Sequence, residues 1–361
     1  MKFPASPWIA ALMILTHTVR GELKAPLQTE EMTNGSQTLA PLAQLQTQVI
    51  RSTALLMNAQ GKPTATATWV GEEGYFITKA SEVPRLEDCT VEHSSGPNAR
   101  IREIRRDTKH DVVLAQAIGV QKVSPVRFDS SKKLTFGQWI VAPSRGTDLK
   151  IGVVSAKRRP IKGFGAAIGI RMDDRTAAEI AGVRIVGVAE DSPAATAGLR
   201  ADDIMIELAG ESVREFRRVN EIISKRQPGE EIAVKYRRAG KEDLLHVRLA
   251  SRTKVLSNWD GEDFANGGIS IRTDNFAEIL QHDLPLNPTD MGGPLLDLQG
   301  RAIGLNIARV DRVTTFALPS EIFWPIIEKW MEADLHPPKA VPANALESSP
   351  PQPVKKMQPN G

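Results

Sequence analysis

The chain has 361 residues, of which 41% are hydrophobic and 25% charged, with a formal net charge of +3. This length predicts two or three domains, and the balanced charge argues against a nucleic-acid partner, which requires a one-signed basic surface. The single cysteine excludes an intramolecular disulfide, and the six histidines lack the spacing of a metal site. We therefore expect a folded protein with no metal, no small-molecule cofactor and no nucleic-acid partner.

Residues 1–21 have the features of a secretory signal peptide. Lys2 precedes an apolar run from Pro7 to Leu15, and the small residue Gly21 offers a cleavage site. The apolar run is shorter than the roughly 20 residues that a transmembrane helix needs. We expect export to the periplasm or the cell exterior, with an uncleaved N-terminal membrane anchor as the alternative. Residues 22–45 are then expected to form a linker.

Between residues 46 and 162 the pattern predicts short strands separated by turns. The segments TATATWV and YFITKAS flank a Gly-Glu-Glu-Gly turn, and DVVLAQAI, QWIVAPS and KIGVVSAKRRPI follow. Short strands at such regular spacing are typical of a β-barrel or a β-sandwich.

Residues 163–252 predict a separate α+β module. A strand leads to a short helix that ends at Gly198, and a second strand, DIMIEL, follows. The segment REFRRVNEIISKR places apolar residues three and four positions apart, which predicts an amphipathic helix that stops at 227–229. A hairpin around Ala239-Gly240 completes the module.

Residues 253–335 return to strands and turns and end in the helix SEIFWPIIEKWME, for which we expect Ser320 as the N-cap. The α+β module is thus predicted to be inserted within a β domain. Residues 336–361 are rich in Pro, Ser and Asn, have few large apolar side chains, and are predicted to be a disordered tail.

Three blocks of the β regions resemble the HtrA (Deg) family of trypsin-like serine proteases. GEEGYFITKASEV is similar to the family's histidine loop, whose text is close to G-Y-I-L-T-N-x-H-V. RDTKHDVVLAQAI is similar to its D-x-x-x-D-L-A-L-L-K-I stretch. LQHDLPLNPTDMGGPLLDLQGRAIGLNIA is similar to its nucleophile loop, which contains N-P-G-N-S-G-G-P-L. The resemblance implies a mostly β fold with a trypsin-like double β-barrel, in two parts at 46–162 and 253–335. The inserted position of the α+β module departs from the family, in which the PDZ domain follows the protease domain.

The inserted module resembles a PDZ domain, through SPAATAGLRADDIMIELAGESV. A PDZ domain binds the C-terminus of a peptide by strand addition. The resemblance implies that Ala167, Ile168, Gly169 and Ile170 form the loop that receives the terminal carboxylate, and that Val219 and Ile222 line an apolar pocket. The alternative is a groove that is blocked or used internally.

A catalytic triad needs a nucleophile, a base and an acid that orients the base. The resemblance places Asp111 at the acid position, Ser81 at the histidine position and Met291 at the serine position. Serine is no general base at neutral pH, and a thioether is a poor nucleophile toward a carbonyl. Thr289 replaces the glycine that supports the oxyanion hole.

Three functions follow as hypotheses. The first is an exported pseudoprotease that binds C-terminal or unfolded peptides through its PDZ domain, as a scaffold, sensor or holdase. The second is an active serine-type endopeptidase with an unusual site, in which Thr289 is a displaced nucleophile and His282 or His110 a displaced base. The third is a regulatory subunit of an active HtrA-like homologue; a homo-oligomer is the other expected assembly.

Overall fold

The computed structural model describes residues 28–32, 35–94, 96–144, 148–173, 181–257 and 268–337. The expected signal peptide and all but two residues of the expected tail lie outside them. The chain divides into two compact units, Met1–Gln44 and Leu45–Gly361. The described part of the first unit carries short helical turns where a linker was predicted: η1 (Thr29–Glu31), α2 (Ser36–Leu39) and η2 (Ala40–Leu42). The helix α3 (Ala43–Arg51) leads into the second unit.

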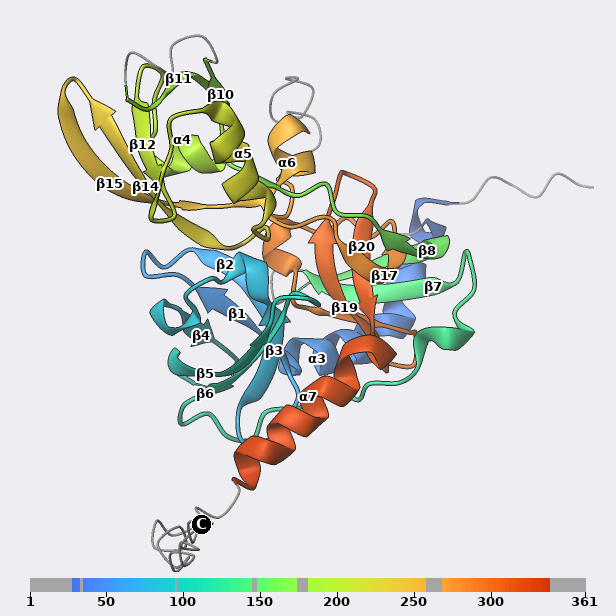
Figure 1. Ribbon diagram of the computed structural model, residues 1–361. Coiled ribbons are helices and arrows are strands. Elements are labelled where there is room, and N and C mark those ends of the chain that lie inside the picture. Colours follow the sequence, from blue (N-terminus) through green and yellow to red (C-terminus); the bar gives the residue numbers. More distant parts are fainter. Residues whose placement is uncertain are drawn as a thin grey trace, which may run out of the picture. The chain divides into compact units, whose positions relative to one another are not determined.

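The first strands of the second unit close into a six-stranded barrel, in the order β1-β2-β3-β6-β5-β4 (Figure 1). Their bounds are β1 (Thr53–Met57), β2 (Pro63–Trp69), β3 (Tyr75–Lys79), β4 (Thr90–Glu92), β5 (Ala99–Asp107) and β6 (Val112–Ala117). The turns η3 (Ala80–Glu82) and η4 (Leu86–Asp88) lie between β3 and β4. Leu56, Trp69 and Phe76 are buried in its core because alternate strand residues point inward.

A second barrel closes in the order β17-β20-β19-β18-β7-β8. Its strands are β7 (Trp139–Ser144), β8 (Asp148–Ile161), β17 (Phe276–His282), β18 (Pro294–Leu296), β19 (Ala302–Arg309) and β20 (Thr315–Pro319). The turn η5 (Ser131–Lys133) precedes β7, and η7 (Pro288–Asp290) precedes β18.

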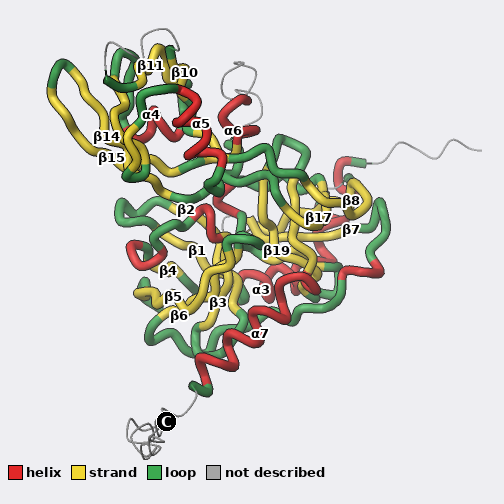
Figure 2. Tube along the Cα trace, in the orientation of Figure 1, coloured by secondary structure: helices red, strands yellow, loops and turns green. Residues whose placement is uncertain are grey.

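The helix α7 (Ser320–Leu335) follows the second barrel (Figure 2). It buries Phe323 and Ile327 in a cluster shared with residues of both barrels, Leu114 and Leu305 among them. The N-cap prediction was wrong by one residue, because Pro319 is the cap and Ser320 is the first helical residue. The Ser320 hydroxyl instead donates to the carbonyl of Asp129.

Between β8 and β17 the chain forms the α+β module. Its sheet runs in the order β10-β11-β12-β14-β15, with β13 beside β12. The elements are β9 (Ala166–Ala167), β10 (Ile170–Met172), β11 (Val183–Val188), α4 (Pro193–Ala197), β12 (Ile204–Leu208), β13 (Glu211–Ser212), α5 (Phe216–Ser224), β14 (Glu231–Arg238), β15 (Lys241–Arg248) and β16 (Ala250–Ser251). The helix α6 (Arg252–Ser257) follows.

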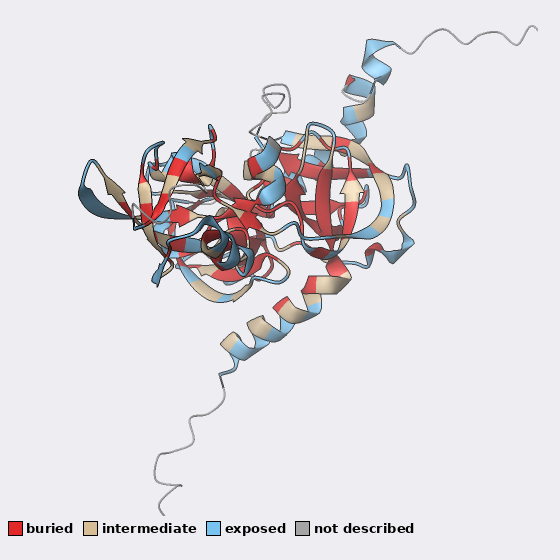
Figure 3. Ribbon diagram, turned by 45° about the horizontal axis from the view of Figure 1, so that its top comes forward, coloured by how far each residue is buried: buried red, intermediate tan, exposed pale blue. Residues whose placement is uncertain are grey.

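The predicted fold class, mostly β with barrels and an inserted α+β module, is confirmed. Within the module, α4 is capped by Gly198 at φ +94°, and Arg238 pairs with Lys241 at the predicted hairpin. Figure 3 shows that buried residues gather along the barrel strands. Among the described residues, no helix combines the length and the apolar character that crossing a membrane would demand.

Candidate functional site

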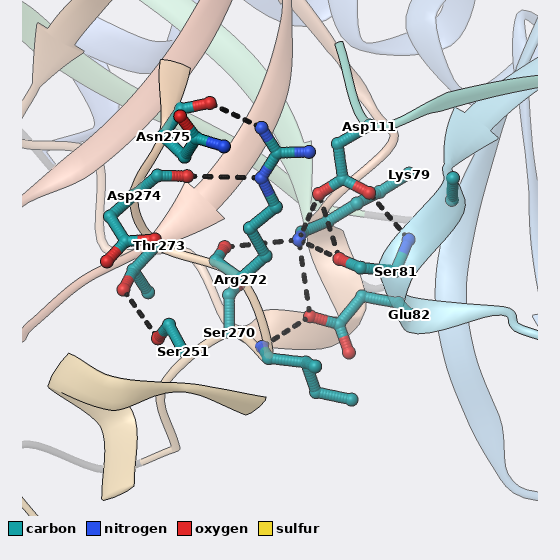
Figure 4. A network of polar contacts seen from close by, with 12 residues as sticks. Lys79, Ser81, Glu82, Asp111, Ser251, Ser270, Arg272, Thr273, Asp274 and Asn275 are labelled. Carbon is teal, nitrogen blue, oxygen red and sulfur yellow. Dashed lines mark hydrogen bonds and ion pairs between the residues drawn. The ribbon is translucent and has the colours of Figure 1, made fainter. Parts of the chain in front are cut away.

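The end of β3 and the start of β6 bring Lys79, Ser81 and Asp111 together. The two strands are antiparallel, and Lys79 pairs with Val112, the residue after Asp111. Asp111 itself has a left-handed backbone conformation, with φ +62°, which aspartate tolerates better than most residues. The carboxylate therefore turns back over η3, where Ser81 lies (Figure 4).

Lys79 is completely buried and forms the centre of a polar network. Its Nζ donates to Asp111 Oδ2 at 2.8 Å, to the hydroxyl of Ser81 and to the carbonyl of Arg272 at 3.2 Å, and lies 3.8 Å from Glu82 Oε1. A buried ammonium ion requires such a partner, because desolvation of an unpaired charge is costly. Lys79 is therefore placed as the counter-ion of Asp111.

Ser81, at the position that the family resemblance gives to histidine, is bonded to the same carboxylate. Its amide donates to Asp111 Oδ1 at 2.7 Å, and its hydroxyl donates to Oδ2 at 2.8 Å. Ser81 is only 5% exposed. Its hydroxyl proton is thus directed at a carboxylate.

The loop after α5 of the inserted module packs directly on Ser81. A Cβ placed on Gly229 would lie 2.8 Å from Ser81 Cβ and 3.0 Å from Ser81 Cα, and Gly229 has φ +94°. Only glycine fits there without a shift of one of the two segments. A cavity of about 230 Å³ lies between them, lined by Ser81, Arg106 and Asp111 on one side and residues 227–231 on the other.

Arg272 supports this network from the segment before β17. It is 1% exposed and donates to the carbonyls of Thr108, Lys109, Asp274 and Asn275. Its guanidinium lies 4.5 Å from the centroid of the Phe276 ring, a cation–π contact. Arg272 thereby fixes the carbonyl that receives Lys79. The sequence analysis did not identify Lys79 or Arg272 as site residues. Lys79 could have been noticed, because it replaces the family's asparagine in the segment YFITKA.

The loop that carries Met291 is hydrogen-bonded to Thr66 of the first barrel. Met291 is 0% exposed and packs in the core of the second barrel with Leu284, Leu295 and their neighbours. Its amide donates to the carbonyl of Pro288 at 3.2 Å, and its carbonyl accepts from the amide of Thr66 at 2.9 Å. The amide that would stabilise an oxyanion is therefore already used inside η7. The carbonyl of Thr289 accepts from the Thr66 hydroxyl at 3.0 Å.

Asp290 and Gly292 explain why this loop holds its shape. The buried Asp290 carboxylate accepts from the amide of Asn287 at 2.7 Å and from the hydroxyl of Ser144 at 3.0 Å. Gly292 has φ +89°, and a Cβ there would lie 2.3 Å from the carbonyl oxygen of Thr66. The Gly-Gly-Pro frame therefore serves close packing between the two barrels.

The two histidines considered as displaced bases are bonded elsewhere. His282 is fully buried, its Nε2 lies 2.9 Å from Asn306 Oδ1, and burial lowers its pKa to about 4. His110 Nδ1 lies 2.6 Å from Asp107 Oδ2. Burial would raise the pKa of Asp107, but the bonds from His110 outweigh it and lower that pKa. These contacts direct neither ring to Thr289.

The expected peptide groove is formed by the loop Ala167–Ile170 and β10. The carbonyl of Ile168 accepts from Ala194 at 2.8 Å, and that of Gly169 accepts from Ala189 at 2.9 Å. Gly169 has φ +81°, and a Cβ there would lie 2.3 Å from Ser192 Cβ. In the described part of the sheet β10 has a neighbour, β11, on one side only, so its other edge faces the position of an added strand.

Val219 and Ile222 lie on α5, as predicted, but they are 0% and 3% exposed within the core of the module. Their side chains already contact the sheet. The alternation of apolar residues on a helix cannot separate residues that fill a core from residues that line a groove, since both need the same face.

Comparisons with known proteins agree with this architecture. The PDZ domain family model matches residues 166–249. A probable periplasmic serine endoprotease DegP-like from Bartonella henselae is 21% identical over 323 residues, covering 67% of this chain and 61% of the relative. A protein of the same name from Marinomonas sp. is 31% identical over 67 residues, covering 17% of this chain and 14% of the relative. The chain thus spans less than two thirds of the length of these relatives.

Solved structures that resemble the chain include the HtrA-type protease AlgW with decapeptide and the serine endoprotease from Yersinia pestis. Each is 13% identical and covers 58% of this chain, with 98% and 97% of the other chain covered and a TM-score of 0.28 in both cases. The chain therefore carries a PDZ domain at residues 166–249, and over 67% of its length it is similar to a probable periplasmic serine endoprotease DegP-like.

Proposed function

We propose that this chain is an exported HtrA-like pseudoprotease, which binds C-terminal or unfolded peptides through its PDZ domain and does not cleave them. Its role would be that of a scaffold, sensor or holdase. The observation that carries the proposal is the buried Lys79–Asp111 ion pair, at 2.8 Å, because the ammonium occupies the acid that would otherwise orient a base.

Three features support the absence of cleavage. The side chain at position 291 packs in a hydrophobic core and carries no ionisable proton. The Met291 amide is bonded to Pro288, which leaves a poor oxyanion hole. The loop 227–229 packs on Ser81, so an imidazole introduced there would meet Gly229 and the Lys79 ammonium.

Peptide binding is supported by the edge position of β10 and by the rigid turn before it. Strand addition requires an edge with unpaired backbone groups, and a terminal carboxylate requires a loop of fixed shape. Ile170 pairs with Val188 on β11, which fixes the edge strand to the rest of the sheet.

Two assays test the proposal. The first measures hydrolysis of a fluorescently labelled unfolded protein by the natural chain and by the double variant Ser81→His with Met291→Ser. We expect no turnover from either, because the variant leaves Lys79 and the 227–229 loop in place. Steady turnover by the natural chain, abolished by a change at Thr289 or His282, would establish an active endopeptidase instead.

The second assay measures binding of a library of peptides with free C-termini by fluorescence anisotropy. Ile170→Asp places a charge on the edge strand and should abolish binding. The matched control is Val186→Asp on β11, where the side chain is 41% exposed; it should bind as the natural chain does. Equal binding by the two variants would contradict a groove at β10.

A further inference from the structure

We propose that Arg248 forms a second binding site, specific for a carboxylate group, in a cavity at the base of the PDZ domain. The cavity has a volume of about 260 Å³. Its lining includes two residues of β15, the edge strand opposite β10 in the sheet, and Ala250, which pairs with Ala167 of the expected carboxylate loop.

The walls of the cavity combine basic and apolar groups. Its lining residues come from the loop before α4, from α4, β14, β15, β16 and α6, and from the segment before β17: Asp191, Pro193, Thr196, Ala197, Glu231, His246, Arg248, Ala250, Lys254 and Ile271. Arg248 and Lys254 provide the cations, and Pro193, Ala197 and Ile271 provide the apolar surface. This mixture suits a charged head group attached to a short apolar part.

Arg248 is the observation that points to a ligand. Two of its guanidinium nitrogens, Nε and Nη2, are buried and have no hydrogen-bond partner among the described residues. An unsatisfied buried donor costs about 1–3 kcal/mol, and more on a charged group. Nε and Nη2 are also the pair of donors with which arginine binds the two oxygens of a carboxylate. The guanidinium is thus arranged for an acceptor that the protein itself does not supply.

The surrounding charges are mixed. Arg248 and Lys254 both lie near Glu82, whose Oε1 already accepts from the amide of Ile271 at 3.0 Å and faces Lys79. Burial lowers the pKa of Arg248 and of Lys254, and Glu82 opposes this lowering in both. Asp111 and Glu231 also oppose it at Arg248, and Asp191 opposes it at Lys254, but none of these carboxylates hydrogen-bonds to Nε or Nη2 of Arg248.

The acidic residues at the rim limit the class of anion. Glu231 and Asp191 are exposed residues of the same lining. They would repel a dianion such as phosphate more strongly than a monoanion. The site therefore fits a single carboxylate, from the C-terminus of a peptide or from an aspartate or glutamate side chain. This inference deepens the proposed peptide-binding function, since it adds a second contact point beside the β10 groove.

Isothermal titration calorimetry on the full chain provides the test. Four probes separate the sources: acetyl-Ala-Ala-Ala with a free C-terminus, the same peptide amidated, acetyl-Ala-Glu-Ala-amide and acetyl-Ala-Gln-Ala-amide. The variant is Arg248→Gln, and the matched control is Arg237→Gln on β14, a partly exposed arginine of the same sheet. We expect carboxylate-bearing probes to bind at least about tenfold more weakly to Arg248→Gln and unchanged to the control.

Thermal unfolding gives a second readout. Because Nε and Nη2 have no partner, Arg248→Gln should unfold at the same temperature as the natural chain or higher. A glutamate probe should raise that temperature in the natural chain only. A clear loss of stability in Arg248→Gln would make the guanidinium a structural ion-pair partner, and would overturn the proposal.

Inorganic phosphate serves as a fifth probe. Two further outcomes would also overturn the proposal: equal binding of acidic and amide probes, or tighter binding of phosphate than of the carboxylate probes. Loss of binding in Ile170→Asp with no effect of Arg248→Gln would reject this site and leave the β10 groove intact. The reverse pattern would support this site and reject the groove, so the two proposals fail separately.

Discussion

The two barrels surround the positions that the family resemblance gives to histidine and to serine in opposite ways. In the first barrel, Ser81 and Lys79 keep the site polar, and a buried ion pair with Asp111 takes up the space. In the second barrel, Met291 stands at the position that the family resemblance gives to serine, and its side chain is part of the hydrophobic core. A buried carboxylate needs an ion pair or several hydrogen bonds, whereas a side chain without charged neighbours can be surrounded by apolar atoms. Asp111 therefore has a cation and hydrogen-bond donors around it, and Met291 packs among apolar side chains while the neighbouring Asp290 carboxylate takes up hydrogen bonds from Asn287 and Ser144.

The largest effect is expected when the buried cation Lys79 is removed. Lys79→Met leaves Asp111 unpaired and should lower the free energy of unfolding by about 3–5 kcal/mol. Adding Asp111→Asn should recover part of that loss, because asparagine tolerates the positive φ and carries no charge. Urea denaturation of Lys79→Met, Asp111→Asn and the double variant measures the coupling. If the double variant is as unstable as the two single changes added together, Lys79 and Asp111 are not a coupled pair.

The second test asks whether the Met291 side chain belongs to the hydrophobic core of the second barrel. Met291→Ser removes buried apolar atoms and should cost about 2–5 kcal/mol in the free energy of unfolding. Met291→Leu keeps the volume and should cost less than about 1.5 kcal/mol. Chemical denaturation measures the free energy of unfolding of both variants. A serine variant as stable as the natural chain would mean that position 291 is still built for a polar residue.

The third test measures how the stability of the chain depends on pH through His282, a buried residue of the second barrel. His282 has a folded pKa of about 4 against an ordinary value near 6.5, so the unfolded chain binds the extra proton first as the pH falls. Stability should therefore decrease between pH 6.5 and 4, by about 2 kcal/mol at pH 5 from this residue. His282→Gln should flatten that part of the curve, while a change at the exposed His336 should not. An unchanged slope in His282→Gln would assign the acid sensitivity to other groups.

The smallest effect is expected for Ser81→Ala. The hydroxyl is one of several partners of the Asp111 carboxylate, so its loss should cost about 1 kcal/mol. Ser212→Ala, on exposed β13, is the control. A cost as large as that of Lys79→Met would show that the hydroxyl, and not the ammonium, is the main partner of Asp111.

The sequence predicted the architecture well because strands, turns and the α5 helix leave local patterns. It also identified Ser81, Asp111 and Met291 as positions of interest through family resemblance. It could not predict that Lys79 would be buried, because one lysine at a strand end normally reaches solvent. Arg272 and Gly229 were missed because their roles depend on contacts with distant parts of the chain. The segment 227–229 was interpreted only as a helix stop, and the structure places it on Ser81.

The insertion of the PDZ domain has a consequence for the order of folding. Strands β8 and β17 must pair to close the second barrel, yet the whole inserted domain separates them, for example at Ile161 and Phe276. The two ends of that domain meet where Ala166 and Ala167 pair with Ser251 and Ala250. Once the PDZ domain has folded, this pairing brings β8 and β17 close and removes most of the loop-closure entropy. Completion of the second barrel should therefore wait for the PDZ domain, which makes folding of the inserted domain a kinetic prerequisite for closing the barrel that carries it.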